Sequence, residues 1–110
     1  MLGQVFGDWM SGNPLDSYRK IDPEVIKVFE NLQDLAFSEG ELPQKLKFLM
    51  AMAIDVDHGA LQGAIALGKR AIASGATKEE IVETLRVVYH IGGTGELYTS
   101  AITLQNLFKI

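Results

Sequence analysis

The sequence predicts an all-α protein, a bundle of five to six helices joined by short turns. Apolar residues recur every three to four positions along most of the 110 residues, as they do on helices, and no useful stretch alternates as a strand would. Capping residues and glycine stops divide the chain into segments of helical length. No internal repeat is present, so these segments are expected to pack as one small bundle.

An N-terminal arm, residues 1–20, is expected to precede a helical domain at residues 21–110. The arm is rich in glycine and carries Phe6 and Trp9, aromatic residues that we expect to dock on their own chain or on a neighbouring subunit. Residues 14–20 have the length of a short helical turn. No basic region precedes an apolar run at the N-terminus, so no signal peptide is expected.

The first firm helix is expected to begin at Asp22-Pro23. An aspartate there accepts hydrogen bonds from free amide groups, and proline at the first helical position gives up no hydrogen bond. Gly40 is expected to end this helix. Its apolar stripe is formed by Val25, Val28, Phe29, Leu32, Leu35 and Ala36.

A second helix follows Pro43, and apolar residues cover most of its circumference. It is therefore expected to be central and buried on several sides. Its apolar residues are Leu46, Phe48, Leu49, Met50, Met52, Ala53 and Ile54.

Small residues distinguish the third helix, residues 59–74. Glycine inside a helix costs about 1 kcal/mol relative to alanine, so Gly59, Gly63 and Gly68 are expected to permit close packing against a neighbouring helix. Gly75 follows as the C-terminal stop.

A capping box, Thr77 with Glu80, opens the fourth helix, which is expected to run to about Ile91. The glycine-rich segment 92–95 is expected to be the turn before the last helix. That helix places on one side Leu97, Ala101, Leu104 and Phe108.

A resemblance to a known family rests on three segments: FENLQDLAFSEGELPQKLKFLMAMAI, GALQGAIALGKRAIASGATKEEI and VVYHIGGTGELYTSA. Their most specific part is Gly75–Ile81. The chain resembles the carboxymuconolactone decarboxylase and alkylhydroperoxidase D-like (AhpD-like) family, as a divergent member. The resemblance implies an all-α fold, an antioxidant (peroxidase-type) or decarboxylase ancestry, and a homo-oligomer such as a trimer or hexamer.

The peroxidase branch of this family carries a Cys-x-x-Cys pair and a distal histidine on the third helix, with a relay glutamate on the helix before it. A further histidine sometimes lies between the cysteines. Counted back from Gly75, these positions fall, without a gap, on Ala60 and Gly63 for the cysteines, Leu67 and Gln62 for the histidines, and Phe48 for the glutamate.

All of these relay positions have changed, and the chain has no cysteine, so the family's thiol peroxidase chemistry is not expected. The decarboxylase branch lacks the cysteines but keeps a histidine at the position of Leu67, and leucine cannot shuttle a proton. We expect the ancestral pocket to have become a closed apolar seam. Its expected lining is Phe48, Ala60, Gly63 and Leu67.

The most interesting polar residues are Asp55, Asp57 and His58, which precede the third helix, and His90, which ends another helix. Histidine titrates near neutral pH, so these four residues are the candidate catalytic set for acid–base chemistry. The same residue types can bind a divalent metal. They are equally typical of helix capping and turns, and we expect neither a resident metal nor another cofactor.

Composition limits the classes of partner that we expect the protein to bind. The net charge of −4, with no basic run, does not favour nucleic acid, and no apolar run approaches membrane-spanning length. The absence of cysteine fits a reducing cytoplasm, which is the expected location. The expected partners are further copies of the chain and a small-molecule ligand. Whether the protein is an enzyme stays open between three alternatives: a divergent family enzyme, a non-enzymatic oligomer that binds a small apolar molecule, and a new acid–base or metal enzyme.

Overall fold

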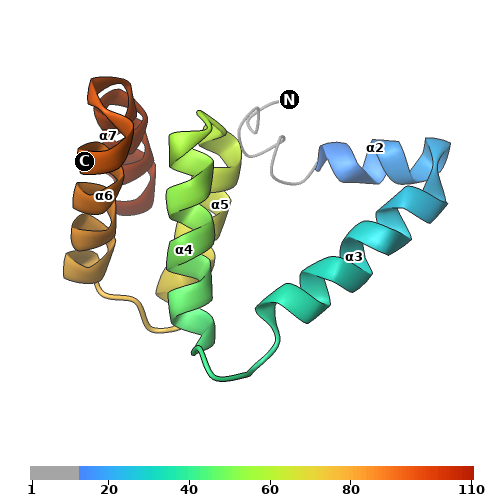
Figure 1. Cartoon of the computed structure of the whole chain (residues 1–110). Coiled ribbons are helices and arrows are strands. Elements are labelled where there is room, and N and C mark those ends of the chain that lie inside the picture. The colour runs from blue at the N-terminus through green and yellow to red at the C-terminus, as the bar shows by residue number, and fades with distance from the viewer. Residues whose placement is uncertain (1–12) are drawn as a thin grey trace. The chain divides into compact units, whose positions relative to one another are not determined.

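A computed structural model describes residues 13–110, which form six helices and no strand (Figure 1). The helices are α2 (Pro14–Ile21), α3 (Pro23–Phe37), α4 (Gln44–Asp57), α5 (Leu61–Ala73), α6 (Lys78–Gly92) and α7 (Thr94–Phe108). The predicted all-α class is confirmed. The expectation for Phe6 and Trp9 lies outside the described residues. None of the six helices has the length and apolar character that crossing a membrane requires.

The chain divides after Ser38 into two compact units. The described part of the first unit holds α2 and α3, and the second unit, from Glu39 onward, holds α4 to α7. The proposed boundary between an arm at residues 1–20 and a domain at 21–110 stays a prediction.

In the first unit, helix caps define both α2 and α3. The Asn13 side chain accepts a hydrogen bond from the Leu15 amide at 2.8 Å, and Pro14 occupies the first turn of α2. Asp22 ends α2 and starts α3, because its carboxylate accepts from the Val25 amide at 3.2 Å. The predicted start of the first firm helix is therefore confirmed, and the short turn ahead of it is a full two-turn helix.

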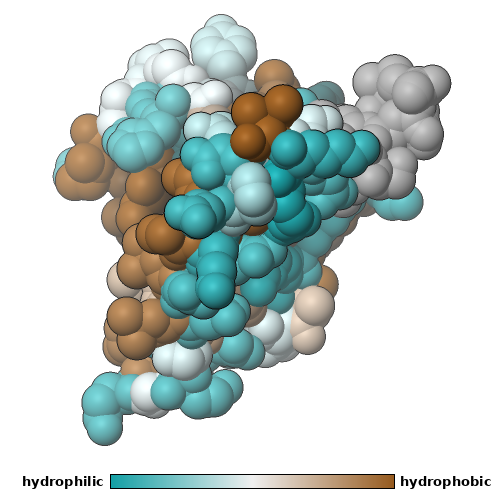
Figure 2. Space-filling model, turned by 90° about the vertical axis from the view of Figure 1, so that its right-hand side faces the viewer, coloured by the Kyte–Doolittle hydropathy of each residue, from teal (hydrophilic) through white to brown (hydrophobic). Residues whose placement is uncertain are grey.

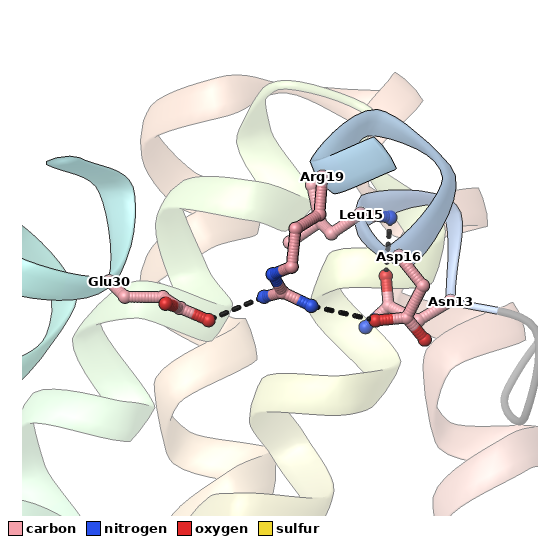
Figure 3. A network of polar contacts seen from close by, with 5 residues as sticks. All are labelled: Asn13, Leu15, Asp16, Arg19 and Glu30. Atoms are coloured by element: carbon pink, nitrogen blue, oxygen red, sulfur yellow. Dashed lines mark hydrogen bonds and ion pairs between the residues drawn. The ribbon is translucent and has the colours of Figure 1, made fainter. Parts of the chain in front are cut away.

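Arg19 connects the two helices of this unit. Its guanidinium bonds Asp16 on its own helix at 3.0 Å and also Glu30 on α3, so one cation bridges two carboxylates (Figure 3). The three side chains are about half exposed, and solvent screening keeps such pairs weak. The bridge therefore orients α2 against α3 more than it stabilises them.

The apolar stripe predicted for α3 has the expected helical spacing, but all six of its residues are exposed. Its five large residues range from 41% exposed for Val25 to 71% for Leu35, whereas Ile26, outside the predicted stripe, is buried. Apolar side chains reach the surface of the molecule in Figure 2.

In the second unit, α4 is the central helix and contacts α5, α6 and α7, with α4 and α5 side by side (Figure 1). One face of α4 is buried, through Phe48, Leu49, Met52 and Val56. The expectation that α4 is buried on several sides is only partly right. Its other stripe is exposed and consists of Leu46, Met50 and Ile54.

Close packing explains the glycine at position 68. A Cβ on Gly68 would lie 2.7 Å from a methyl carbon of Leu107 on α7 and 3.2 Å from the sulfur of Met52 on α4. Both distances are shorter than ordinary van der Waals contact, so a side chain at this position would force Leu107 and Met52 to shift. The predicted packing role of the third helix is confirmed at this position.

Two glycine stops end α4 and α5 in the same way. At the end of α4, Gly59 has a φ of 71°, the Ala60 amide donates to the Asp55 carbonyl, and the Gly59 amide donates to the Val56 carbonyl. This is a Schellman motif, and Gly75 closes α5 with the same pattern. Gly59 therefore terminates α4, and the third helix begins at Leu61 rather than at position 59 as expected.

The capping box of α6 is confirmed. The Thr77 hydroxyl accepts from the Glu80 amide at 3.0 Å, and the Glu80 carboxylate accepts from the Thr77 amide at 2.9 Å. Glu80 also bonds the Lys45 ammonium at 3.1 Å, which ties α6 to α4. The Thr77 amide, together with Lys45, holds the pKa of Glu80 below its usual value of 4.5.

The turn before the last helix is shorter than predicted. Helix α6 continues through Gly92 and α7 starts at Thr94, so the chain reverses at Gly93 alone, whose φ is 97°. A residue with a side chain rarely adopts this φ, and the glycine makes the one-residue connection possible.

Candidate functional site

Two of the four residues that the sequence predicts as signature positions lie at the N-terminal end of α5. Ala60 and Gly63 help to line an open depression of about 380 Å³, formed by residues 59–63. Ala60 is exposed and Gly63 is half-buried. This part of the site is open to solvent, in contrast to the closed seam that the sequence predicts.

The other two positions do not line this depression. Phe48 is buried in α4 and only 4% exposed, and the guanidinium of Arg70 lies 4.5 Å from the centre of its ring. Leu67 is half-buried in α5. Sequence reasoning missed Arg70, because its contact with Phe48 joins two different helices and leaves no local pattern.

Asp55 fills the space beside Gly63. A Cβ built on Gly63 would lie 3.1 Å from the carboxyl carbon of Asp55 and closer still to its Oδ2. A real Cβ is essentially never that close to another heavy atom. The carboxylate on α4 thus occupies the space that a side chain at this position of α5 would need.

The last turn of α4 also shapes the electrostatics of Asp55. Partial burial raises the pKa of the Asp55 carboxyl above its usual value of 3.8, and the charge of nearby His58 opposes that rise. His58 is the C-cap residue of α4, and its amide donates to the Ile54 carbonyl at 3.0 Å. The Schellman motif at Gly59 therefore sets the positions of Asp55 and His58 together.

Asp57 points toward a different neighbour. A Cβ on Gly92 would lie 2.6 Å from Asp57 Oδ1 and 2.7 Å from the carboxyl carbon of Glu96, so both acidic side chains approach the end of α6. Asp57 and His58 also help to line a depression of about 310 Å³ between α4 and α6. Its other lining residues are Ala53, Ile54, Val87, Val88 and Ile91.

The four predicted polar residues therefore do not form one cluster. His58 lies beside Asp57 and interacts electrostatically with Asp55, whereas His90 is exposed on α6 and does not line the depression that holds His58. Within residues 13–110, no three histidine, aspartate or glutamate side chains gather as metal ligands. The arrangement can support proton transfer at Asp55 and His58, without His90.

Comparison with known proteins agrees with this fold. The model of the carboxymuconolactone decarboxylase family matches residues 23–104. The uncharacterized protein H16_B0147 of Cupriavidus necator is 29% identical over 79 residues, which cover 71% of this chain and 70% of that protein.

A solved structure is also similar. The crystal structure of apo-lpg0406, a carboxymuconolactone decarboxylase family protein from Legionella pneumophila, superposes with a TM-score of 0.84 at 30% identity. The match covers 89% of this chain and 88% of that one. This chain belongs to the carboxymuconolactone decarboxylase family.

Proposed function

We propose that this family member works without thiol-dependent peroxidase chemistry, as a self-associating protein that binds a small molecule. A thiol peroxidase needs a thiolate, and the 110 residues include no cysteine. The observation that carries the proposal is the carboxylate of Asp55 beside Gly63. The Asp55 carboxylate occupies the space next to Gly63, the second expected signature position, so a carboxylate stands where a cysteine side chain would need room.

The remaining signature positions support the same proposal. Leu67 and Phe48 stand where the resembled relay has histidine and glutamate, and neither side chain exchanges protons. The Arg70 guanidinium lies 4.5 Å from the centre of the Phe48 ring. A proton relay by the family route therefore lacks its donors.

A peroxide assay tests this proposal. Purified full-length protein is incubated with cumene hydroperoxide and dithiothreitol, and peroxide loss is followed against a protein-free control and an albumin control. We expect all three rates to agree. Thiol-dependent turnover above both controls would refute the proposal.

A second candidate function, acid–base catalysis by Asp55 and His58, is favoured by one observation. The pKa of Asp55 is raised by partial burial, and the open depression of residues 59–63 is next to it. A carboxyl whose pKa moves toward neutrality is a better general acid or base at physiological pH. Asp55 would exchange the proton, and the charge of His58 would lower the pKa of Asp55.

Decarboxylation of carboxymuconolactone, the reaction in the family's name, is the natural assay for this candidate. Carbon dioxide release is measured for the wild type, Asp55→Asn, His58→Gln and His90→Gln. Acid–base catalysis at this site predicts turnover that Asp55→Asn abolishes and His90→Gln leaves unchanged. Equal rates in all four proteins would exclude it.

Self-association, as a trimer or hexamer, is the third part of the proposal. The second unit exposes large apolar side chains on α4, α6 and α7, and such surface usually marks an interface. They include Leu46, Met50, Ile54, Val87, Ile91, Leu97, Tyr98 and Ile102. Light scattering on the eluting protein measures the mass directly, and a well-folded monomer would contradict this part alone.

A further inference from the structure

A groove between α6 and α7 is separate from the depression beside Asp55. It encloses about 230 Å³. Its lining residues are Val82, Leu85, Arg86, Tyr89, Leu97, Ser100, Ala101 and Leu104. Five of these eight side chains are aliphatic, so the groove favours an apolar body. Its volume lies below the roughly 300–1,000 Å³ of typical ligand pockets, so the occupant is small.

Arg86 of α6 and Ser100 of α7 both line this groove. The chain reverses at Gly93, so the two helices run in opposite directions, which sets Arg86 level with Ser100. Tyr89 and Leu97 line the groove nearer to the Gly93 turn, and Val82 and Leu104 line it farther from that turn.

Ser100 carries an unsatisfied hydroxyl. Its side chain is 5% exposed, and Oγ has no hydrogen-bond partner within the described part of the chain. Two other hydroxyls on these helices, those of Thr84 and Thr103, each donate to the carbonyl four residues earlier at 2.8 Å. A buried hydroxyl without a partner costs free energy, and because Ser100 lines the groove, an acceptor bound there would give Oγ a partner once the side chain rotates about its Cα–Cβ bond.

Arg86 supplies a charge at the same level. It is exposed, and within residues 13–110 it forms no ion pair. A guanidinium only donates hydrogen bonds, and a serine hydroxyl can donate one as well. Two donors at one level of an apolar groove are complementary to an acceptor that carries negative charge.

We propose that the α6–α7 groove binds a small monocarboxylate with an apolar body. After rotation of both side chains, the carboxylate accepts hydrogen bonds from the Arg86 guanidinium and from the Ser100 hydroxyl. The apolar body lies along the aliphatic wall toward Leu97 or Leu104. This site goes beyond the proposed function, because it uses neither the signature positions nor Asp55.

Octanoate and octanol are matched probes for this site, since they differ mainly in the charged head group. Isotope-labelled full-length protein is titrated with each, and backbone amide signals are followed by nuclear magnetic resonance. We expect octanoate to shift the amides of residues 82–104 in a saturable way, with octanol at least about tenfold weaker, as a charged hydrogen bond implies.

Three variants separate the contributions of the groove. Arg86→Gln is expected to weaken octanoate by about tenfold and to leave octanol unchanged, and Ser100→Ala to weaken octanoate by about fivefold. Lys69→Gln, an exposed cation on α5, is the matched control and should bind as the wild type does. Thermal unfolding of each variant verifies that the fold is intact.

Several outcomes would overturn the proposal: unsaturated or scattered shifts, equal affinity for octanol and octanoate, or Arg86→Gln behaving as Lys69→Gln does. Amide shifts in the groove that depend on protein concentration without any ligand would show that a second copy covers it. None of these outcomes bears on the peroxide assay, so the two proposals fail independently.

Discussion

The Asp55 carboxylate of α4 lies directly against Gly63 of α5, in the space that a side chain on Gly63 would need. This contact gives a physical reason for a helix-weakening glycine at position 63. It also means that a side chain at position 63 requires the Asp55 carboxylate to move or to be replaced. The first prediction follows from this coupling.

Replacing Gly63 by alanine should destabilise the wild type by about 1–3 kcal/mol, because the new methyl group would overlap the Asp55 carboxylate. In an Asp55→Ala background the same change should stabilise by up to about 1 kcal/mol, the helix-propensity gain of alanine over glycine. Urea unfolding of the four proteins measures the coupling. Additive effects would mean that Asp55 does not occupy this space.

Gly68→Ala should also destabilise, by about 1–3 kcal/mol, because the methyl group would collide with Leu107 and Met52 in the core. Gly95→Ala is the matched control, since Gly95 is also helical and its Cβ would meet no atom within 4 Å. The control should be neutral or slightly stabilising. Thermal unfolding of both variants makes the comparison, and equal shifts would argue against close packing at Gly68.

The raised pKa of Asp55 predicts a pH dependence of stability. An acid whose pKa is higher in the folded state binds more protons there, so its contribution to stability falls as pH rises from 3.8 through the folded-state pKa. Below pH 3.8 the Asp55 carboxyl is protonated and causes no loss of stability. Above the folded-state pKa it is ionised, and the loss of stability is complete. Wild type should therefore lose stability relative to Asp55→Asn across this window.

Urea unfolding of wild type and Asp55→Asn between about pH 3 and 7 provides the measurement. Since the His58 charge lowers the pKa of Asp55, His58→Ala should extend the window to higher pH. A constant difference between wild type and Asp55→Asn across the range would contradict the burial of this carboxyl.

The capping box at the start of α6 gives the opposite pH dependence. Thr77→Ala should cost about 1 kcal/mol, because the Glu80 amide loses its acceptor. Glu80 has a lowered pKa, so its contribution is present above pH 4.5 and is lost as pH falls through the lowered value. Glu80→Gln should therefore be less stable than wild type at pH 7 and approach it in acid.

Glu79→Gln is the control for this prediction, because Glu79 is also in the first turn but lies outside the capping box. Its stability should change little between pH 7 and pH 3 relative to wild type. Equal behaviour of the two glutamine variants would mean that the charge near the helix start, rather than the specific bonds of Glu80, carries the effect.

Local chemistry explains which features could be predicted from the chain. Asp22 starts α3, Gly75 ends α5, and Thr77 with Glu80 starts α6, because each of these structures depends on residues within a few positions of one another. Gly59 is the exception, because the sequence predicts it at the start of the third helix and the structure has it as the stop of α4. Its role as the stop of α4 depends on two hydrogen bonds that the residue type alone does not specify.

The site was less predictable, because its contacts join different helices. The signature positions could be counted along the chain, but the packing of Asp55 on Gly63 and of Arg70 on Phe48 depends on how α4 and α5 approach each other. The same holds for Ser100, whose spacing on α7 gives no sign that its hydroxyl lacks a partner.

The sequence by itself determined the all-α class, most helix boundaries and the absence of a redox cysteine, since these follow from periodicity, caps and composition. Only the tertiary structure decided that His90 does not line the depression that holds His58, and that Arg86 and Ser100 line one groove. The physical reason is distance along the chain. Helix formation is governed by neighbours within about four residues, whereas side chains from different helices meet only through packing.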